Sequence, residues 1–346
     1  MELFKLAQKT ENLLESYRRE GFFKDAVVSV FSDRENLFTK SLGNVNKDTL
    51  FDVASLTKIC TATIVLLLID KNKLKLSSLA VDILPELKTI KDERIPKINI
   101  EMLLTHTSLL PAWYPFYTSE EDFYAVFNKA LKQPRHEGML YSDLNFMLLG
   151  KIIEKISRKP LQQALCDELA NPFNLGNMCF LPESENIAYS SYGNLHEEDM
   201  VKDMGLAYNN WRRHEPIKGQ ANDGNAFCYF KGVAGHAGIF ADVKAYERLC
   251  QIYLNTQNGL FVSATQEQFP TRGLGFQTDD KYPCGCGHTG FTGTSIYFSR
   301  DYKIGCCLFT NRLFYPYKNE KPTNEVRRAL HNIVFEYAKN LHAQHL

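Results

Sequence analysis

The 346-residue sequence has no excess of charge of either sign, because 40 basic residues balance 40 acidic ones. Without a net charge there is no overall field to draw the protein to nucleic acid or an anionic membrane, so we expect neither as a partner. The sequence also lacks an apolar run of the roughly 20 residues that cross a bilayer. Its first residues lack the basic and then apolar succession of a secretory signal. These absences predict a cytoplasmic protein.

The cysteines do not form a disulfide framework, since nine is an odd number and their spacing is irregular. This usage is typical of a reducing compartment. The run Cys284, Cys286 and His288 offers two thiolates and an imidazole, which are reasonable zinc ligands. Ligands in a strict alternating line converge poorly on a tetrahedron, so we expect buried apolar cysteines here and no metal.

What the sequence does contain is an ordinary globular composition, 44% hydrophobic and 23% charged, over a length sufficient for two lobes. Apolar periodicity predicts helices at both ends, over residues 3–19 and 324–342. Alternating segments predict two hairpins, with arms 25–33 and 36–44 and arms 287–299 and 304–312. Between residues 56 and 224 the signals are mainly helical and loop-like, with helices expected over 57–72, 99–105, 119–131, 142–156 and 161–170. The pattern predicts an α+β fold, with a sheet built from both ends of the chain around a helical insertion.

One segment combines a buried helix with a reactive pair, "LFDVASLTKICTATIVLLLIDKNKLKL" (residues 50–76). Ser55 and Lys58 stand three positions apart, so on a helix the amine can reach the hydroxyl. A serine becomes a nucleophile only when a base takes its proton, and burial lowers the pKa of a lysine toward the range of a base. A serine at this position is also typical of a helix N-cap. The tetrapeptide alone leaves both interpretations open, a catalytic serine and an N-cap.

Two further patterns are weak separately but informative in order. Tyr141-x-Asp143 stands at the start of a predicted helix, and His288-Thr289-Gly290 opens a predicted strand. Together with Ser55-x-x-Lys58, they resemble the serine β-lactamase and penicillin-binding-protein superfamily, in its class C branch. "LLTHTSLLP", "GVAGHAGIFAD" and "GHTGFTGTS" are also similar to hydrolases of this branch, including amidases of muramyl peptides. The likeness covers residues 26–312.

The resemblance implies a β-lactamase/transpeptidase-like fold, in which residues 1–58 and 225–346 form an α/β sandwich lobe. Residues 59–224 would form the helical lobe, with the active site between the two. It implies that Ser55 is acylated, that Lys58 and Tyr141 share its proton, and that the backbone N–H groups of Ser55 and Phe291 hold the oxyanion. Asp143, His288, Thr289 and Gly290 would support the site, and no cofactor is implied.

Three departures from the family pattern bear on substrate and mechanism. Asp143 replaces an asparagine of many relatives, and its charge would keep Lys58 protonated and make Tyr141 the likelier proton acceptor. His288 replaces a lysine, and a largely neutral imidazole weakens the case for substrates whose carboxylate must be held. Arg312 is a substitute cation for that task. The third, Leu109 in place of a glycine, is expected to alter only a turn.

We therefore expect a serine hydrolase acting on an ester or amide, a carboxylesterase or amidase, with muramyl peptides as one substrate class. The alternatives are a D,D-carboxypeptidase or β-lactamase, and a catalytically silent binding protein on the same fold. The expected partner is a small molecule or peptide, and the oligomeric state is left open. His106 is expected to be structural, while the role of His236, between glycines, is undecided.

Overall fold

A five-stranded antiparallel sheet forms the centre of one half of the molecule. The computed structural model describes residues 1–212 and 215–344. The strand order is β2-β1-β10-β9-β8, where the strands are β2 (Asn36–Leu42), β1 (Ala26–Ser32), β10 (Ile304–Thr310), β9 (Ser295–Ser299) and β8 (Cys286–Thr289). The central strand is β10, and β1 lies between it and the edge strand β2, with Ala26 opposite Thr310. The two ends of the chain therefore build one sheet, as expected, and the α+β prediction is confirmed.

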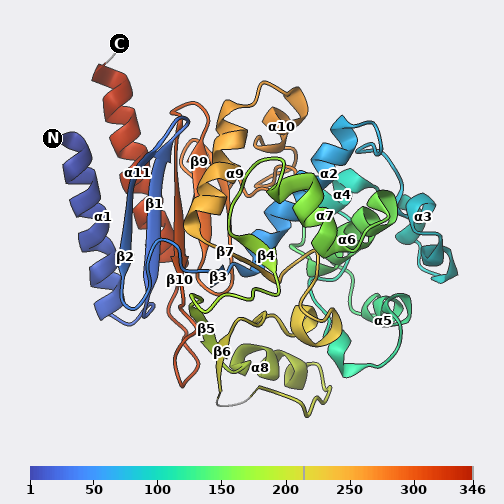
Figure 1. Ribbon diagram of the computed structural model, residues 1–346. Helices are drawn as coiled ribbons and strands as arrows, with labels where there is room; N and C mark the ends of the chain where they lie inside the picture. Colours follow the sequence, from blue (N-terminus) through green and yellow to red (C-terminus); the bar gives the residue numbers. More distant parts are fainter. Residues whose placement is uncertain (213–214, 345–346) are drawn as a thin grey trace.

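Each face of this sheet is covered by helices because β1 is apolar on both sides. Val28 and Val30 face α1 (Glu2–Arg19) and α11 (Asn324–Gln344) in one core. Val27 and Phe31 point to the opposite face, into the larger core that includes α9 (Val243–Asn255). Since side chains alternate along a strand, β1 contributes residues to the hydrophobic cores on both faces of the sheet. Figure 1 shows the terminal helices side by side on one face, and α9 with the helical half on the other.

The helical half is organised around α2 (Thr57–Asp70), in which every residue from 57 to 68 is buried. A helix that is apolar all round is stable only when other elements enclose it. α6 (Asp143–Ser157), the segment Leu165–Ala170 and α10 (Gly259–Ala264) pack against it. The other helices outside the terminal lobe are α3 (Ala80–Ile83), α4 (Ile100–Leu104), α5 (Phe123–Ala130), α7 (Leu161–Ala164), which continues into Leu165–Ala170, and α8 (Leu195–Asp203). Among the described residues, no helix is both long and apolar enough to span a bilayer.

The structure differs from the predicted elements in three places. The arm expected over 287–299 is two antiparallel strands, β8 and β9, because the chain reverses at Gly293, whose φ of 114° suits glycine. The helix expected from residue 119 begins at Phe123, where the Asp122 carboxylate accepts hydrogen bonds from the first turn. Short strands also occur between residues 56 and 224, where helix and loop were expected: β5 (Tyr189–Tyr192) pairs with β6 (Pro216–Lys218), and β4 (Met178–Phe180) pairs with β7 (Ile239–Ala241). β7 also pairs with β3 (Phe51–Asp52), and neither of these two short strands was predicted.

Candidate active site

Ser55 lies in a single 3₁₀ turn, Ala54–Leu56, that leads directly into α2. The turn starts at Ala54 with a φ of 48°, and the buried Asp52 carboxylate holds it by accepting the Ala54 N–H at 2.8 Å. One turn further along, the Lys58 ammonium donates to the Ser55 hydroxyl at 3.1 Å and to the His236 carbonyl at 3.0 Å. The structure therefore brings the predicted pair together.

Lys58 is completely buried, and it forms a 2.7 Å ion pair with Asp143 at the start of α6. Burial by itself lowers the pKa of this lysine, but the Asp143 carboxylate and Tyr141 outweigh it and leave the pKa above the usual value. Lys58 is consequently an ammonium at neutral pH. The sequence offers two opposing arguments about the Lys58 pKa, from burial and from the Asp143 charge, and the carboxylate outweighs burial.

Tyr141 immediately precedes α6 and lies against Lys58, whose nitrogen is 5.0 Å from the centre of the phenol ring. The rings of His106 and His288 lie 4.6 Å and 5.9 Å from it. His106 accepts the Ser142 N–H through Nδ1 at 3.0 Å, so it fixes the entry to α6. That contact supports the structural role expected for His106, which follows α4 and holds the residue before α6.

β8 and the turn that follows it form the opposite wall of the site. Two hydroxyls bind this turn to the segment before Ser55: Thr292 donates to the Asp52 carbonyl at 2.7 Å and Thr294 to the Val53 carbonyl at 3.0 Å. Gly290 has no room for a side chain, since a Cβ would lie 2.5 Å from the Val53 carbonyl. The turn is thereby held against the serine, and Phe291 lines the same cavity as Ser55.

His288 is fully buried on β8, and its Nδ1 lies 2.9 Å from the Thr289 carbonyl. Burial, together with the charges of Lys58 and Arg272, holds the pKa of His288 well below its usual value. The imidazole is therefore neutral, and the N–H on Nδ1 donates to the carbonyl of Thr289. Histidine at this position supplies no positive charge to the site.

The cavity over Ser55 has an acidic and aromatic lining. It is formed by Ala54, Ser55, Trp113, Tyr141, Asp143, His196, Glu197, Met200, Asn222, Asp223, Ala237 and Phe291. Burial would raise the pKa of Asp223, but its 3.0 Å contact with the His236 imidazole lowers it below the usual value. His236, undecided from sequence, thus holds Lys58 through its carbonyl and Asp223 through its ring. Sequence reasoning missed Asp223 and Glu197, because both lie in a region without a recognisable motif.

Glu197 gives the cavity a measurable pH dependence. Its burial and the neighbouring Asp223 charge raise its pKa to about 8, although Gly224 N–H and Tyr117 hydroxyl bond its carboxyl oxygens at 2.6 and 2.7 Å. An acid that is more protonated when folded stabilises the protein at low pH, and this stability is lost as the pH rises through the folded value. Between about pH 4.5 and 8 the parent should lose stability from this group.

Glu197→Gln is therefore expected to match the parent's unfolding temperature only near pH 4.5, to exceed it already at pH 6, and to exceed it by about 2–4 °C more at pH 9 than at pH 6. The amide keeps the shape of the protonated acid and cannot ionise. Thermal unfolding at both pH values measures this, with the exposed Glu336→Gln as the control. A Tm difference that is equal at pH 6 and pH 9 would contradict the assignment.

Two residues considered from sequence lie elsewhere. Arg312 is behind Phe291, with its guanidinium 5.1 Å from that ring and bonded to the Thr323 hydroxyl at 2.8 Å. It is not among the described residues that line the cavity. Cys284 is exposed and has a φ of 47°, which breaks the strand geometry that would align it with Cys286 and His288. In the described part of the chain, these three donors do not gather within 4.8 Å.

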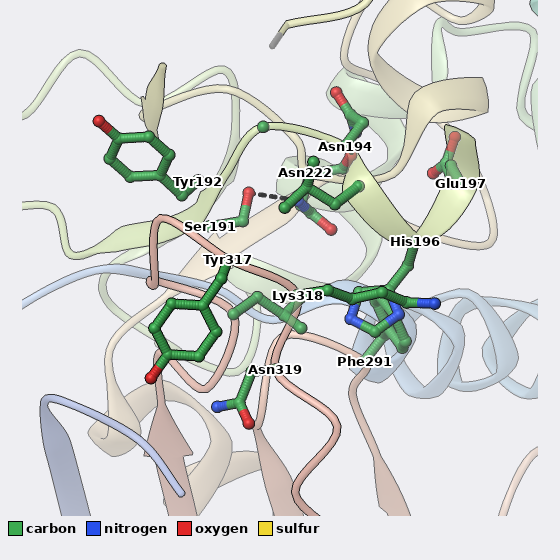
Figure 2. Close-up of a pocket in the computed structure, with 13 residues that line it drawn as sticks. Ser191, Tyr192, Asn194, His196, Glu197, Asn222, Phe291, Tyr317, Lys318 and Asn319 are labelled. Carbon is green, nitrogen blue, oxygen red and sulfur yellow. Dashed lines mark hydrogen bonds between the residues drawn. The ribbon is translucent and has the colours of Figure 1, made fainter. Parts of the chain in front are cut away.

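A second, smaller pocket adjoins the cavity. Figure 2 shows its lining, in which His196 and Phe291 lie beside each other and Asn222 is hydrogen-bonded to Ser191. The His196 and Phe291 rings meet edge to face at 5.3 Å. Both rings, with Glu197 and Asn222, line both spaces. His196 and Phe291 therefore form the partition between the serine cavity and the smaller pocket.

A serine and a buried ammonium lie at the start of the enclosed helix α2, with a tyrosine from the start of α6 and the edge strand β8 beside them. This arrangement is that of a serine hydrolase of the β-lactamase/transpeptidase fold. The chain belongs to the β-lactamase family, whose model matches residues 6–330. It is 28% identical over 310 residues to an N-acetylmuramyl-L-alanine amidase of Bacillus subtilis (strain 168), covering 78% of this chain and 69% of that protein.

Solved structures share this fold. A class C β-lactamase superimposes with a TM-score of 0.72 at 16% identity, covering 97% of this chain and 99% of the other. EstCE1, described as a hydrolase with promiscuous acyltransferase activity, gives a TM-score of 0.69 at 18% identity, with 95% and 99% covered. At these identities the likeness concerns the fold alone. The predicted family and fold are confirmed, and members of this family act on small-molecule or peptide substrates.

Proposed function

We propose that the protein hydrolyses an ester or amide through an acyl-enzyme on Ser55. The observation that carries this proposal is the 3.1 Å contact between the Lys58 ammonium and the Ser55 hydroxyl, in a cavity that Tyr141 also lines. A nucleophile, a proton acceptor and a fixed cation are then all within one site, as covalent catalysis requires.

Tyr141 is the proposed proton acceptor. Lys58 is paired with Asp143 and already carries its proton, so it has no lone pair to offer. As the Ser55 Oγ bonds to the substrate carbonyl carbon, its proton passes to the phenolate oxygen of Tyr141. Collapse of the tetrahedral intermediate breaks the bond to the leaving group, which takes that proton. Water then repeats the sequence on the acyl-enzyme and regenerates Ser55.

The proposed oxyanion site lies between the backbone N–H groups of Ser55 and Phe291. The hydroxyls of Thr292 and Thr294 support it by binding their turn to the residues before Ser55. Preorganised donors of this kind stabilise developing negative charge, and each contributes about 10²–10³ in rate. Thr289 and Gly290 act here as spacers that bring the turn to this position.

For the substrate, we propose an ester, or an amide of the muramyl-peptide class, the latter supported by the Bacillus subtilis relative. Neutral His288 and the acidic lining formed by Asp143 and Asp223 disfavour a substrate carboxylate in the cavity. The runner-up is a D,D-carboxypeptidase or β-lactamase, because a relative that is 26% identical over 311 residues is described as a putative D-alanyl-D-alanine carboxypeptidase.

A substrate panel tests this proposal: p-nitrophenyl butyrate, N-acetylmuramyl-L-alanyl-D-isoglutamine, a peptide ending in D-alanyl-D-alanine, and nitrocefin. We expect Ser55-dependent hydrolysis of the first or second, with kcat/KM at least about tenfold above the other two, a difference of only about 1.4 kcal/mol in barrier. Faster turnover of the third or fourth would select the runner-up instead.

We also propose a two-lobed organisation, with residues 1–58 and 225–346 in one lobe, residues 59–224 in the other and the active site between them. The sheet strands from both chain ends and the enclosure of α2 support this division. We place the protein in the cytoplasm, because all nine cysteines are free thiols, and such thiols persist in a reducing compartment.

A further inference from the structure

Arg272 is a buried cation to which nothing above gives a role. Only 8% of its surface is exposed, and its Nε is enclosed without a hydrogen-bond partner among the described residues. None of them forms an ion pair or side-chain hydrogen bond with this guanidinium. Burial lowers its pKa below the usual value for arginine. A buried guanidinium without an ion-pair partner lowers the stability of the folded protein. We therefore ask which neighbouring group its positive charge stabilises.

The group that Arg272 faces is Tyr141. Its guanidinium carbon lies 5.4 Å from the centre of the phenol ring, and the Lys58 nitrogen lies 5.0 Å from the same centre. Tyr141 therefore has two cations near its ring, from α2 and from the loop before β8. Asp279 also favours the guanidinium charge, but its carboxylate is bonded to Lys281 at 2.6 Å.

The other titratable neighbours of Tyr141 do not supply a charge. His106 and His288 are both buried, and burial together with the Lys58 and Arg272 charges holds the pKa of each well below its usual value. Asp143 is neutralised by its ion pair with Lys58. The positive charge that remains beside the phenol is that of Arg272.

We propose that Arg272 is a positioning residue for catalysis, which stabilises the phenolate form of Tyr141 and so prepares it to accept the Ser55 proton. This inference rests on the proposed function. Arg272 acts through Tyr141 and needs no contact with substrate.

The test is the rate of covalent labelling by a fluorophosphonate as a function of pH, which needs no knowledge of the natural substrate. In the parent, labelling should rise with pH as the phenolate forms. In Arg272→Gln and Arg272→Met, this rise should move to higher pH by about one to two units, the effect of a unit charge at this distance in protein. At high pH the rates should converge.

Three further variants separate charge from shape. Arg272→Lys keeps the charge and should retain most of the parent profile. Arg272→Gln combined with His288→Lys places an ammonium beside Tyr141 and should restore it. Arg300→Gln is the matched control: this guanidinium also has an enclosed nitrogen without a partner, but it binds the Thr256 carbonyl away from the site.

A uniform loss of rate at every pH, or a profile identical to the parent's, would overturn the role of Arg272. If the neutral variants do not fold, Arg272→Lys decides alone, because a profile displaced by a full unit despite the retained charge would refute the proposal. Failure of the proposed function looks different: the parent would not be labelled, or Ser55→Ala would be labelled equally.

Discussion

Ser55→Ala is expected to abolish covalent labelling by a fluorophosphonate and to reduce hydrolysis by at least about 10³-fold. The hydroxyl is the only protein group in the proposed reaction that bonds to the substrate carbon, so no neighbouring residue can replace it. Among the described residues, the Ser55 side chain forms one hydrogen bond, the 3.1 Å contact with Lys58. The variant should therefore remain close to the parent in stability. Intact-mass spectrometry after labelling, and thermal unfolding, measure the two effects.

Ser191→Ala is the matched control for this experiment. Ser191 lines the adjoining pocket and accepts a hydrogen bond from Asn222, but it does not line the cavity of Ser55. It should be labelled like the parent. An adduct that persists in Ser55→Ala and disappears in Ser191→Ala would identify Ser191, in the adjoining pocket, as the labelled residue. That result would refute the assignment of Ser55 as the nucleophile.

Lys58→Met is expected to damage both activity and stability. Loss of the ammonium removes the cation beside Ser55 and Tyr141, which should slow labelling by about 10²–10⁴-fold. It also leaves the Asp143 carboxylate without its 2.7 Å partner. Removing one member of a buried ion pair costs about 3 kcal/mol, at the lower end here because Asp143 is partly exposed. Chemical denaturation gives the stability change and labelling kinetics the activity change.

A double variant separates these two effects. Lys58→Met combined with Asp143→Asn removes both charges, so much of the lost stability should return while labelling stays slow. If the double variant instead regains parent-like labelling, the ammonium has no part in activating Ser55. If Lys58→Met alone is as stable as the parent, the ion pair does not contribute as its geometry indicates.

The parts of the fold that sequence predicted are those with strong periodicity. In α1, α2 and β1, the order of apolar and polar residues shows directly which side chains are buried. The predicted bounds of these three elements are therefore close to those observed. The division of 287–299 into two strands was missed, because the "TGFTGT" reversal reads equally well as continuous strand. β3, β4 and β7 were missed because two- and three-residue strands have no period to detect.

The site shows the same contrast. Ser55, Lys58 and Tyr141 stand in ordered motifs, and the structure brings them together. Asp223 and Arg272 lie in loops, where sequence spacing says nothing about which side chains meet. Their importance depends on tertiary contacts with His236 and Tyr141, which only the folded chain provides.

The pairing of β1 with β10 also affects when the protein can become active during synthesis. The pairing of β1 with β10 cannot form until Thr310, the partner of Ala26, has been synthesised. The proposed oxyanion site likewise cannot form until the turn at Phe291 has been synthesised and can bind the segment before Ser55. Such distant pairings are slow to close, and translation adds residues at only about 5–20 per second. We expect the nascent chain to carry its serine without reactivity until nearly all of it has left the ribosome. Truncated products would then be inert rather than uncontrolled hydrolases.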